Sequence, residues 1–238
     1  MTTPRIQIPL DLDFRPAYNR ADLFVGASNK EAVDMLDRWQ TWQSPAMIIY
    51  GDEGRGKRHL ASVWQQESAA LSFSAAEFNA LDIADLIDNP QHLIIHQLHL
   101  IAGDTEAEEK LFHLYNKFFQ IKKHFMLLTS RIPPARLQFQ TRDVLTRLTS
   151  CPTIYIDRPS DDLIEHIIGK QLYDHGMVIT PELLRYASSL IGRSWALAKL
   201  FVIGLHNYNL IHKKPITQKI IREILIESED SYEDSIDR

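Results

Sequence analysis

Residues 48–61, "IIYGDEGRGKRHLA", have a glycine spacing that could bind phosphate. Gly51 and Gly56 are five residues apart, with Gly54 between them, and Lys57 follows directly. In a phosphate-binding loop of this G-x-x-x-x-G-K type, backbone N–H groups at a helix N-terminus hold the phosphate oxygens, and the lysine contacts the β- and γ-phosphates. The spacing therefore predicts a P-loop and, with it, a nucleotide as the ligand to consider first.

The residues that would hold Mg²⁺ are absent. Arg58 stands where P-loop enzymes carry a Ser or Thr hydroxyl for the metal. Hydrolysis also needs an acid at the end of a neighbouring strand, and the apolar stretch that fits this position has His96 and Gln97 instead. Neither side chain supplies the anionic oxygen that Mg²⁺ prefers. These two separate losses predict that the chain does not hydrolyse ATP itself.

The loop also contains two acids, Asp52 and Glu53. Their charges oppose an incoming phosphate, and the repulsion grows with the charge of the ligand. An alternative to phosphate binding is that Lys57 and Arg58 neutralise these two acids. We therefore expect an empty loop, or one that binds ADP or a phosphate-like anion, and no complex with Mg-ATP.

Three histidines, His92, His96 and His99, lie close together in the sequence. On a strand, residues 92 and 96 point to one face and residue 99 to the other, so the three cannot converge on a metal without a turn. We expect ordinary hydrogen-bonded histidines and no metal site.

Alternating strands and helices must position this loop. Five short apolar runs are predicted as strands: 46–50, 70–73, 92–98, 124–129 and 153–157. Amphipathic stretches such as 29–42 and 106–121 have helical spacing. Nearly unbroken apolar strands that alternate with helices indicate a parallel sheet covered on both faces, which is an α/β fold.

After Asp157 the sequence predicts helices only. Four helical runs follow, introduced by Ser160, Thr180, Ser194 and Thr217. The chain therefore divides into four segments: an extended N-terminal segment at 1–20, an α/β base domain at 21–157, a helical domain at 158–226 and an acidic, disordered tail at 227–238.

Charge and composition narrow the class of protein. The net charge is −5, but the tail holds six of the 31 acids and one of the 26 basic residues, so the remainder has 25 of each. A neutral body argues against strong direct nucleic-acid binding. No apolar run approaches the ~18 residues of a membrane span. The N-terminus lacks the pattern of a signal peptide, and a single cysteine fits a reducing, cytoplasmic location.

Several motifs occur in the order typical of one family. They are the degenerate P-loop at 51–58, the strand at 93–97, "FMLLTSRIPPARL" at 125–137, "RDVLTRLTSCP" at 142–152, "GRSWALAKLF" at 192–201 and "HKKPIT" at 212–217. Together they resemble the AAA+ proteins related to the bacterial replication initiator DnaA, and within them the Hda-like regulators of alphaproteobacterial type, which inactivate DnaA. The resemblance implies a five-stranded AAA+ sheet with a small C-terminal helical lid domain.

The same resemblance implies roles for several residues. Arg147 corresponds to the arginine finger, which reaches a nucleotide held by a neighbouring AAA+ protein; an arginine paired with a nearby acid is the structural alternative. Thr129 and Ser130 match the polar sensor position. The second sensor is an arginine of the third lid helix, but residues 194–197 contain none, and we expect Trp195 to belong to the lid core.

A short N-terminal peptide resembles the one with which Hda-like proteins bind the replicase sliding clamp. In "QIPLDL", Gln7, Leu10 and Leu12 have the expected offsets. Pro9 favours an extended peptide whose two leucines could fill an apolar groove. The alternative is that Leu10, Leu12 and Phe14 pack onto the sheet domain.

Two functions remain open at this point. The first is a regulator of replication initiation that binds the sliding clamp and presents Arg147 to DnaA-bound ATP without hydrolysing ATP itself. The second is a diverged AAA+ binding module that docks on DnaA or the replisome and blocks initiator assembly. AAA+ domains also commonly associate head-to-tail, so self-association is a further expectation.

Overall fold

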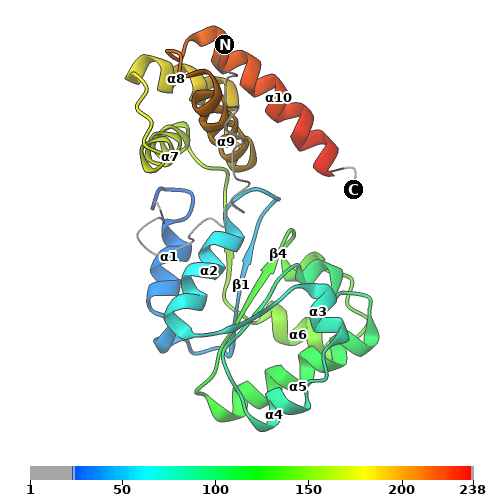
Figure 1. Ribbon diagram of the computed structural model, residues 1–238. Helices are drawn as coiled ribbons and strands as arrows, with labels where there is room; N and C mark the ends of the chain where they lie inside the picture. Colours follow the sequence, from blue (N-terminus) through cyan, green and yellow to red (C-terminus); the bar gives the residue numbers. More distant parts are fainter. Residues whose placement is uncertain (1–22, 24, 237–238) are drawn as a thin grey trace, which may run out of the picture.

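A five-stranded parallel sheet forms the base of the molecule (Figure 1). The computed structural model describes residues 23 and 25–236. The strands are β1 (Ala46–Tyr50), β2 (Leu71–Phe73), β3 (Leu93–Ile95), β4 (Met126–Ser130) and β5 (Thr153–Tyr155). Their order is β2-β3-β4-β1-β5, and every pairing is parallel. The predicted α/β class with a five-stranded parallel sheet is confirmed.

Helices cover both faces of the sheet, as apolar strands require. Six α-helices belong to the described part of the base: α1 (Lys30–Asp37), α2 (Lys57–Ser68), α3 (Ala75–Ala80), α4 (Ala84–Asp88), α5 (Thr105–Ile121) and α6 (Arg142–Thr149). Helices α1 and α2 lie on one face and α3 to α6 on the other (Figure 1). Neighbouring strand residues point to opposite faces, so Ile48 enters one core and Ile49 the other.

Strand β3 is shorter than the predicted run at 92–98. It ends at Ile95, because Gln97 has a left-handed backbone with φ of 60° and the short 3₁₀ helix η3 (Leu98–Leu100) follows. An extended strand cannot continue through a residue in that conformation.

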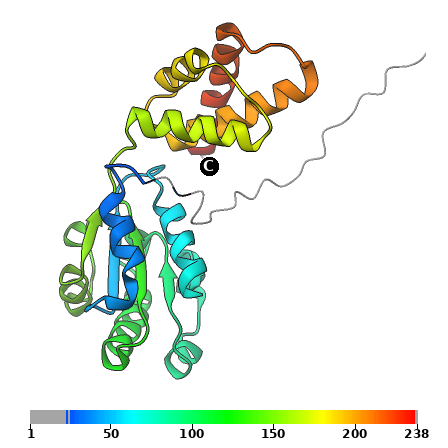
Figure 2. The same cartoon turned by 90° about the vertical axis from the view of Figure 1, so that its left-hand side faces the viewer.

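In the described residues, four helices make up the second domain, the lid: α7 (Asp161–Asp174), α8 (Pro181–Ile191), α9 (Trp195–His212) and α10 (Gln218–Ile236). Ser160, Thr180 and Ser194 cap the first three, since each hydroxyl accepts a backbone N–H of the first turn. The lid has its own core, in which Phe201 and Leu205 of α9 are completely buried. Figures 1 and 2 show the lid next to the loop that joins β1 to α2.

The predicted disordered tail from residue 227 is wrong in the part that the structure describes. Helix α10 continues to Ile236. Ile224, Leu225 and Ser228 are buried on its inner side, so the helix is already nucleated when the acidic stretch begins. Extending an existing helix gains one hydrogen bond for each residue that is fixed, which is far less costly than starting one.

Within the described residues, none of the helices combines the length and the apolar character that crossing a membrane requires.

Candidate functional site

The glycine-rich loop, residues 51–56, joins β1 to α2 at the carboxyl edge of the sheet. Gly51, Gly54 and Gly56 have φ values of 151°, 73° and 82°, a region that residues with a side chain rarely adopt. Gly51 is also tightly packed, because a Cβ there would lie 2.5 Å from the carbonyl oxygen of Ile156. The predicted P-loop sequence thus forms a strand–loop–helix unit whose glycines are needed for the shape of the loop.

Lys57 is turned back into this loop. Its Nζ donates hydrogen bonds to the carbonyl oxygens of Gly51 and Asp52, at 2.6 and 2.7 Å. Burial, only partly offset by Glu53, lowers the pKa of Lys57 to about 8. The ammonium group that would contact phosphates in a working P-loop is bonded here to the loop's own backbone.

The acid Asp52 is neutralised from within the loop by Arg55. This arginine is 8% exposed and forms an ion pair with Asp52. Its guanidinium also bonds to the Tyr155 hydroxyl, donates to the carbonyl oxygen of Ile156 at 3.3 Å and lies 3.6 Å from the Asp157 carboxylate. Arg55 therefore ties the loop to β5 and to the chain that leads from β5 into the lid.

Glu53 pairs with Arg131, which follows β4. The direct ion-pair partners of the two loop acids are therefore Arg55 and Arg131 and not the expected Lys57 and Arg58, although the charges of Glu53 and Asp52 do raise the pKa of Lys57. Lys57 bonds to carbonyl groups, and the Arg58 side chain is exposed at the start of α2. Arg131 could not be foreseen because it reaches the loop from a strand 78 residues further along the chain.

His96 occupies the position where an active ATPase has an acid. Its Nε2 lies 3.1 Å from Ser72 Oγ and its Nδ1 lies 3.3 Å from Thr129 Oγ1. Burial, assisted by the charge of Arg58, lowers the pKa of His96 to about 4. The ring is therefore uncharged at neutral pH and offers no anionic oxygen to a metal ion.

The two residues matched to the sensor position are buried at the end of β4. The Thr129 hydroxyl accepts the backbone N–H of Gln97 at 3.3 Å in addition to its contact with His96. Ser130 Oγ accepts the N–H of Ile132, and its carbonyl oxygen accepts the N–H of Gly51. Both residues thus bind neighbouring protein groups at this edge of the sheet.

The three histidines considered for a metal site have different partners. His92 Nδ1 accepts the backbone N–H of Phe125, and His99 Nδ1 accepts that of Arg131. Among the described residues, no group of three or more His, Cys, Asp or Glu side chains is arranged to hold a metal ion.

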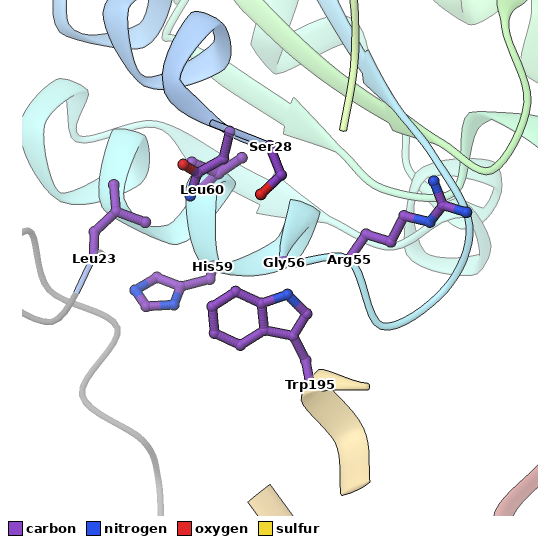
Figure 3. Close-up of a pocket in the computed structure, with 8 residues that line it drawn as sticks. Leu23, Ser28, Arg55, Gly56, His59, Leu60 and Trp195 are labelled. Carbon is purple, nitrogen blue, oxygen red and sulfur yellow. The ribbon is translucent and has the colours of Figure 1, made fainter. Parts of the chain in front are cut away.

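Trp195 does not belong to the lid core, contrary to expectation. It is the first residue of α9, and its half-buried indole points away from the lid core toward the base (Figure 3). The ring lies over Gly56 and beside His59 at the start of α2, and a cavity of about 10 Å³ is left there. The remaining space is roughly that of one water molecule.

An arginine does precede the third lid helix, but it points elsewhere. Arg193 is outside the helix, one residue before its cap Ser194. Its Nε and Nη2 donate to the Asp161 carboxylate of α7, at 3.1 and 3.3 Å. It therefore links the start of α9 to the start of α7.

Arg147 lies in the last turn of α6 and is exposed. Its guanidinium carbon is 5.9 Å from the ring centroid of Tyr115 on α5. Within the described part of the chain no carboxylate forms an ion pair with Arg147, so its neighbour is an aromatic ring and not an acid.

Sequence reasoning missed Glu108, which holds the start of α6. Its side chain is completely buried, and its carboxylate accepts backbone N–H groups of Gly103, Gln140 and Thr141 at 2.8, 3.0 and 2.7 Å. The sequence did contain a sign of this role. Glu108 precedes the buried Leu111 by three residues, a spacing that places its carboxylate on the apolar face of α5. Gln7, Leu10 and Leu12, which are predicted to bind the sliding clamp, lie outside the described residues.

Comparisons with known proteins fit this architecture. No family model matches the chain. It is 22% identical over 233 residues to the chromosomal replication initiator protein DnaA of Treponema denticola, covering 90% of this chain and 50% of that protein. It is 24% identical over 249 residues to DnaA of Bacteroides thetaiotaomicron, covering 94% and 52%. The chain thus spans about half the length of these curated relatives.

Solved structures show the same fold. Domain III of DnaA from Thermotoga maritima superposes with a TM-score of 0.76 at 18% identity, covering 89% of this chain and 97% of that one. RuvB of the same organism gives 0.67 at 17% identity, covering 85% and 69%. The chain is thus similar in sequence to DnaA over about half of that protein, and it shares the fold of DnaA domain III, a five-stranded parallel sheet with a glycine-rich loop and a helical lid.

Proposed function

We propose that this chain is a cytoplasmic, Hda-like regulator of replication initiation that acts on DnaA. It presents Arg147 to ATP bound by DnaA and so promotes hydrolysis there. The observation that carries the proposal is the position of Arg147, an exposed guanidinium at the end of α6 without a carboxylate partner in the described part of the chain. A finger of this kind, offered to a partner's nucleotide, increases the rate of hydrolysis by about 10³- to 10⁵-fold.

The chain's own site fits neither Mg-ATP nor its hydrolysis. Lys57 is bonded to the loop, Arg58 replaces the metal-binding hydroxyl, and His96 is neutral where an acid is required. The loop is expected to be empty or to hold ADP or a small anion weakly on its backbone N–H groups. Purified protein is expected to show no Mg²⁺-dependent ATP turnover above background, and turnover that disappears in Lys57→Ala would contradict this reasoning.

The sliding clamp is the second proposed partner, through residues 7–12. A leucine-containing extended peptide can lie in an apolar groove while the glutamine amide bonds at its rim. Binding to the clamp would place the regulator where DNA is being copied, and the finger would then act on DnaA encountered there.

The decisive experiment compares Arg147→Ala with Arg142→Ala. Both arginines are exposed on α6, so each variant removes one positive charge from the same helix, and Arg142→Ala controls for that loss of charge. DnaA-bound ATP is followed in single-turnover assays with clamp loaded on DNA, and binding to DnaA is measured in parallel. We expect Arg147→Ala to bind but to lose the stimulation by roughly 10³-fold, and Arg142→Ala to keep it. Full stimulation by Arg147→Ala would refute the finger.

The contact of Arg147 with the Tyr115 ring favours a second candidate function. A cation over an aromatic face contributes about 0.5–1 kcal/mol at an exposed site, so Arg147 could serve to fix α6 on α5. The chain would then dock on DnaA and block its assembly without stimulating hydrolysis. In that case Arg147→Ala should still inhibit the assembly of DnaA. Neither the wild-type protein nor Arg147→Ala should then raise the turnover of DnaA-bound ATP above its basal rate.

A further inference from the structure

Trp195 is held over the glycine-rich loop by contacts at the start of the lid. Gly192 ends α8 with φ of 61°, and the Ser194 hydroxyl accepts the N–H of Leu197, so α9 begins at Trp195. Arg193 fixes this corner to Asp161 of α7. The indole therefore projects from the first turn of a capped helix and not from a loop.

The indole fills the space between lid and base. A Cβ added to Gly56, the loop's last glycine, would lie 4.0 Å from the indole Cε2, so the ring faces this glycine and leaves room for little more than a methyl group between them. Figure 3 shows the ring next to His59, with Leu23 and Leu60 beyond that histidine and Arg55 on the opposite side of the ring. The cavity beside the ring that is lined by Ser28, Gly56 and His59 measures about 10 Å³, whereas pockets for small molecules and cofactors measure about 300–1,000 Å³.

The loop under the indole is joined to the hinge of the lid by contacts of Arg55 and Gly51. Arg55 binds the Ile156 carbonyl oxygen and approaches Asp157, the residues at which the base domain passes into α7. A Cβ on Gly51 would also meet the Ile156 carbonyl oxygen, so loop and hinge are in direct contact. Loop and hinge are thus connected through side-chain and backbone groups of the chain itself.

We propose that Trp195 takes the place of a nucleotide as the bridge between lid and base. A ligand lying between two domains stabilises their closed arrangement by binding both, and here an aromatic side chain of the lid makes that contact permanently. The closed lid is then independent of ATP and ADP. This device does not depend on the proposed action on DnaA, because it concerns only the chain's own two domains.

The test measures the arrangement of the domains in the full chain. Small-angle scattering and the rate of proteolysis in the hinge at 156–160 are recorded for wild type, Trp195→Ala and Trp195→Phe. Tyr173→Ala is the matched control, because Tyr173 is a lid aromatic that is 72% exposed. Far-UV circular dichroism establishes that each variant has kept its helices. Trp195→Phe, which keeps an aromatic ring at this position, serves as the second variant if Trp195→Ala does not fold.

In wild type, millimolar ADP or ATP should change neither the scattering curve nor the proteolysis rate. Trp195→Ala should scatter as a more extended particle, and its hinge should be cut roughly tenfold faster, since proteolysis follows the population of the open form. Trp195→Phe and Tyr173→Ala should resemble wild type. A Trp195→Ala variant with the scattering and proteolysis of wild type would overturn the proposal, as would closure of the wild-type lid on addition of nucleotide.

Discussion

Replacing Glu108 by Gln tests how the helix that carries Arg147 is held in place. One carboxylate oxygen of Glu108 accepts the N–H groups of Gly103 and Gln140, and the other accepts that of Thr141 at the start of α6. A glutamine amide has one oxygen that accepts and one NH₂ group that donates. At least one of the three backbone N–H groups would therefore face another donor in a site without access to water.

The expected loss can be estimated from these contacts. A hydrogen bond to a charged group contributes about 1.5–3 kcal/mol, and a buried donor left without a partner costs about 1–3 kcal/mol. Since the amide can keep the bonds on one side, we expect the free energy of unfolding to fall by about 2–4 kcal/mol. Urea unfolding at pH 7 measures this as a lower midpoint with an unchanged slope.

The effect should also depend on pH with a defined sign. Burial alone would raise the pKa of Glu108, but the N–H groups of Gly103, Thr141 and Gln140 outweigh it and lower the pKa from 4.5. The stabilisation that the ionised Glu108 carboxylate contributes is therefore complete above pH 4.5. It is lost as the pH falls through the lower pKa that Glu108 has in the folded state. The difference between wild type and Glu108→Gln should shrink over that range.

Glu109 provides the control for this experiment. It is the next residue of α5 and is exposed, so Glu109→Gln removes the same charge from the same helix without emptying a buried site. We expect a change within about 0.5 kcal/mol. If Glu108→Gln unfolded at the same urea concentration as Glu109→Gln, the hydrogen bonds of Glu108 would not be what holds α6.

Three further outcomes are expected. Gly51→Ala should lower the free energy of unfolding by roughly 2 kcal/mol or more, and by more than Gly54→Ala does. The reason is that a Cβ on Gly51 would meet the carbonyl oxygen of Ile156, whereas one on Gly54 would meet nothing within 4 Å. Equal thermal midpoints of the two variants would contradict this. The pKa of His96 is about 4 in the folded state, against an ordinary 6.5. Between these two pH values the imidazole is protonated only in the unfolded state, so acid favours unfolding. In denaturant titrations, wild type should therefore lose more stability between pH 7 and 5 than His96→Asn does. Alanines at the glutamine and both leucines of residues 7–12 should abolish clamp binding in a pull-down or calorimetric assay without changing helical content, since each buried leucine contributes roughly 1.5–3 kcal/mol; unchanged affinity would place the contact elsewhere.

Elements that depend on local chemistry could be predicted from the sequence. The short apolar runs of β1 and β4 are typical of central strands in a parallel sheet, and both strands are almost entirely buried. Ser160 and Thr180 were identifiable as helix caps because a hydroxyl before an apolar-periodic run serves the free N–H groups of a first turn.

The site could be predicted only in part, because its partners come from distant segments. The loop acids were visible, but the choice between Arg58 beside them and Arg131 far along the chain depends on how the strands are ordered. Trp195 was misplaced because α9 is apolar on nearly all sides, and periodicity then cannot tell a residue that faces the lid core from one that faces the base.

The contacts of the loop's cations have a consequence for regulation. A working P-loop keeps positive charge available for phosphates, but Lys57 here binds carbonyl groups, and Arg55 and Arg131 bind the acids of the same loop. A ligand that entered would have to replace these contacts and displace the indole above them. If Trp195 replaces a nucleotide as proposed, a change between ATP and ADP in this chain should not move its lid. If the chain acts on an AAA+ partner, the nucleotide that sets its timing must be the partner's, which Arg147, exposed at the end of α6, is free to meet.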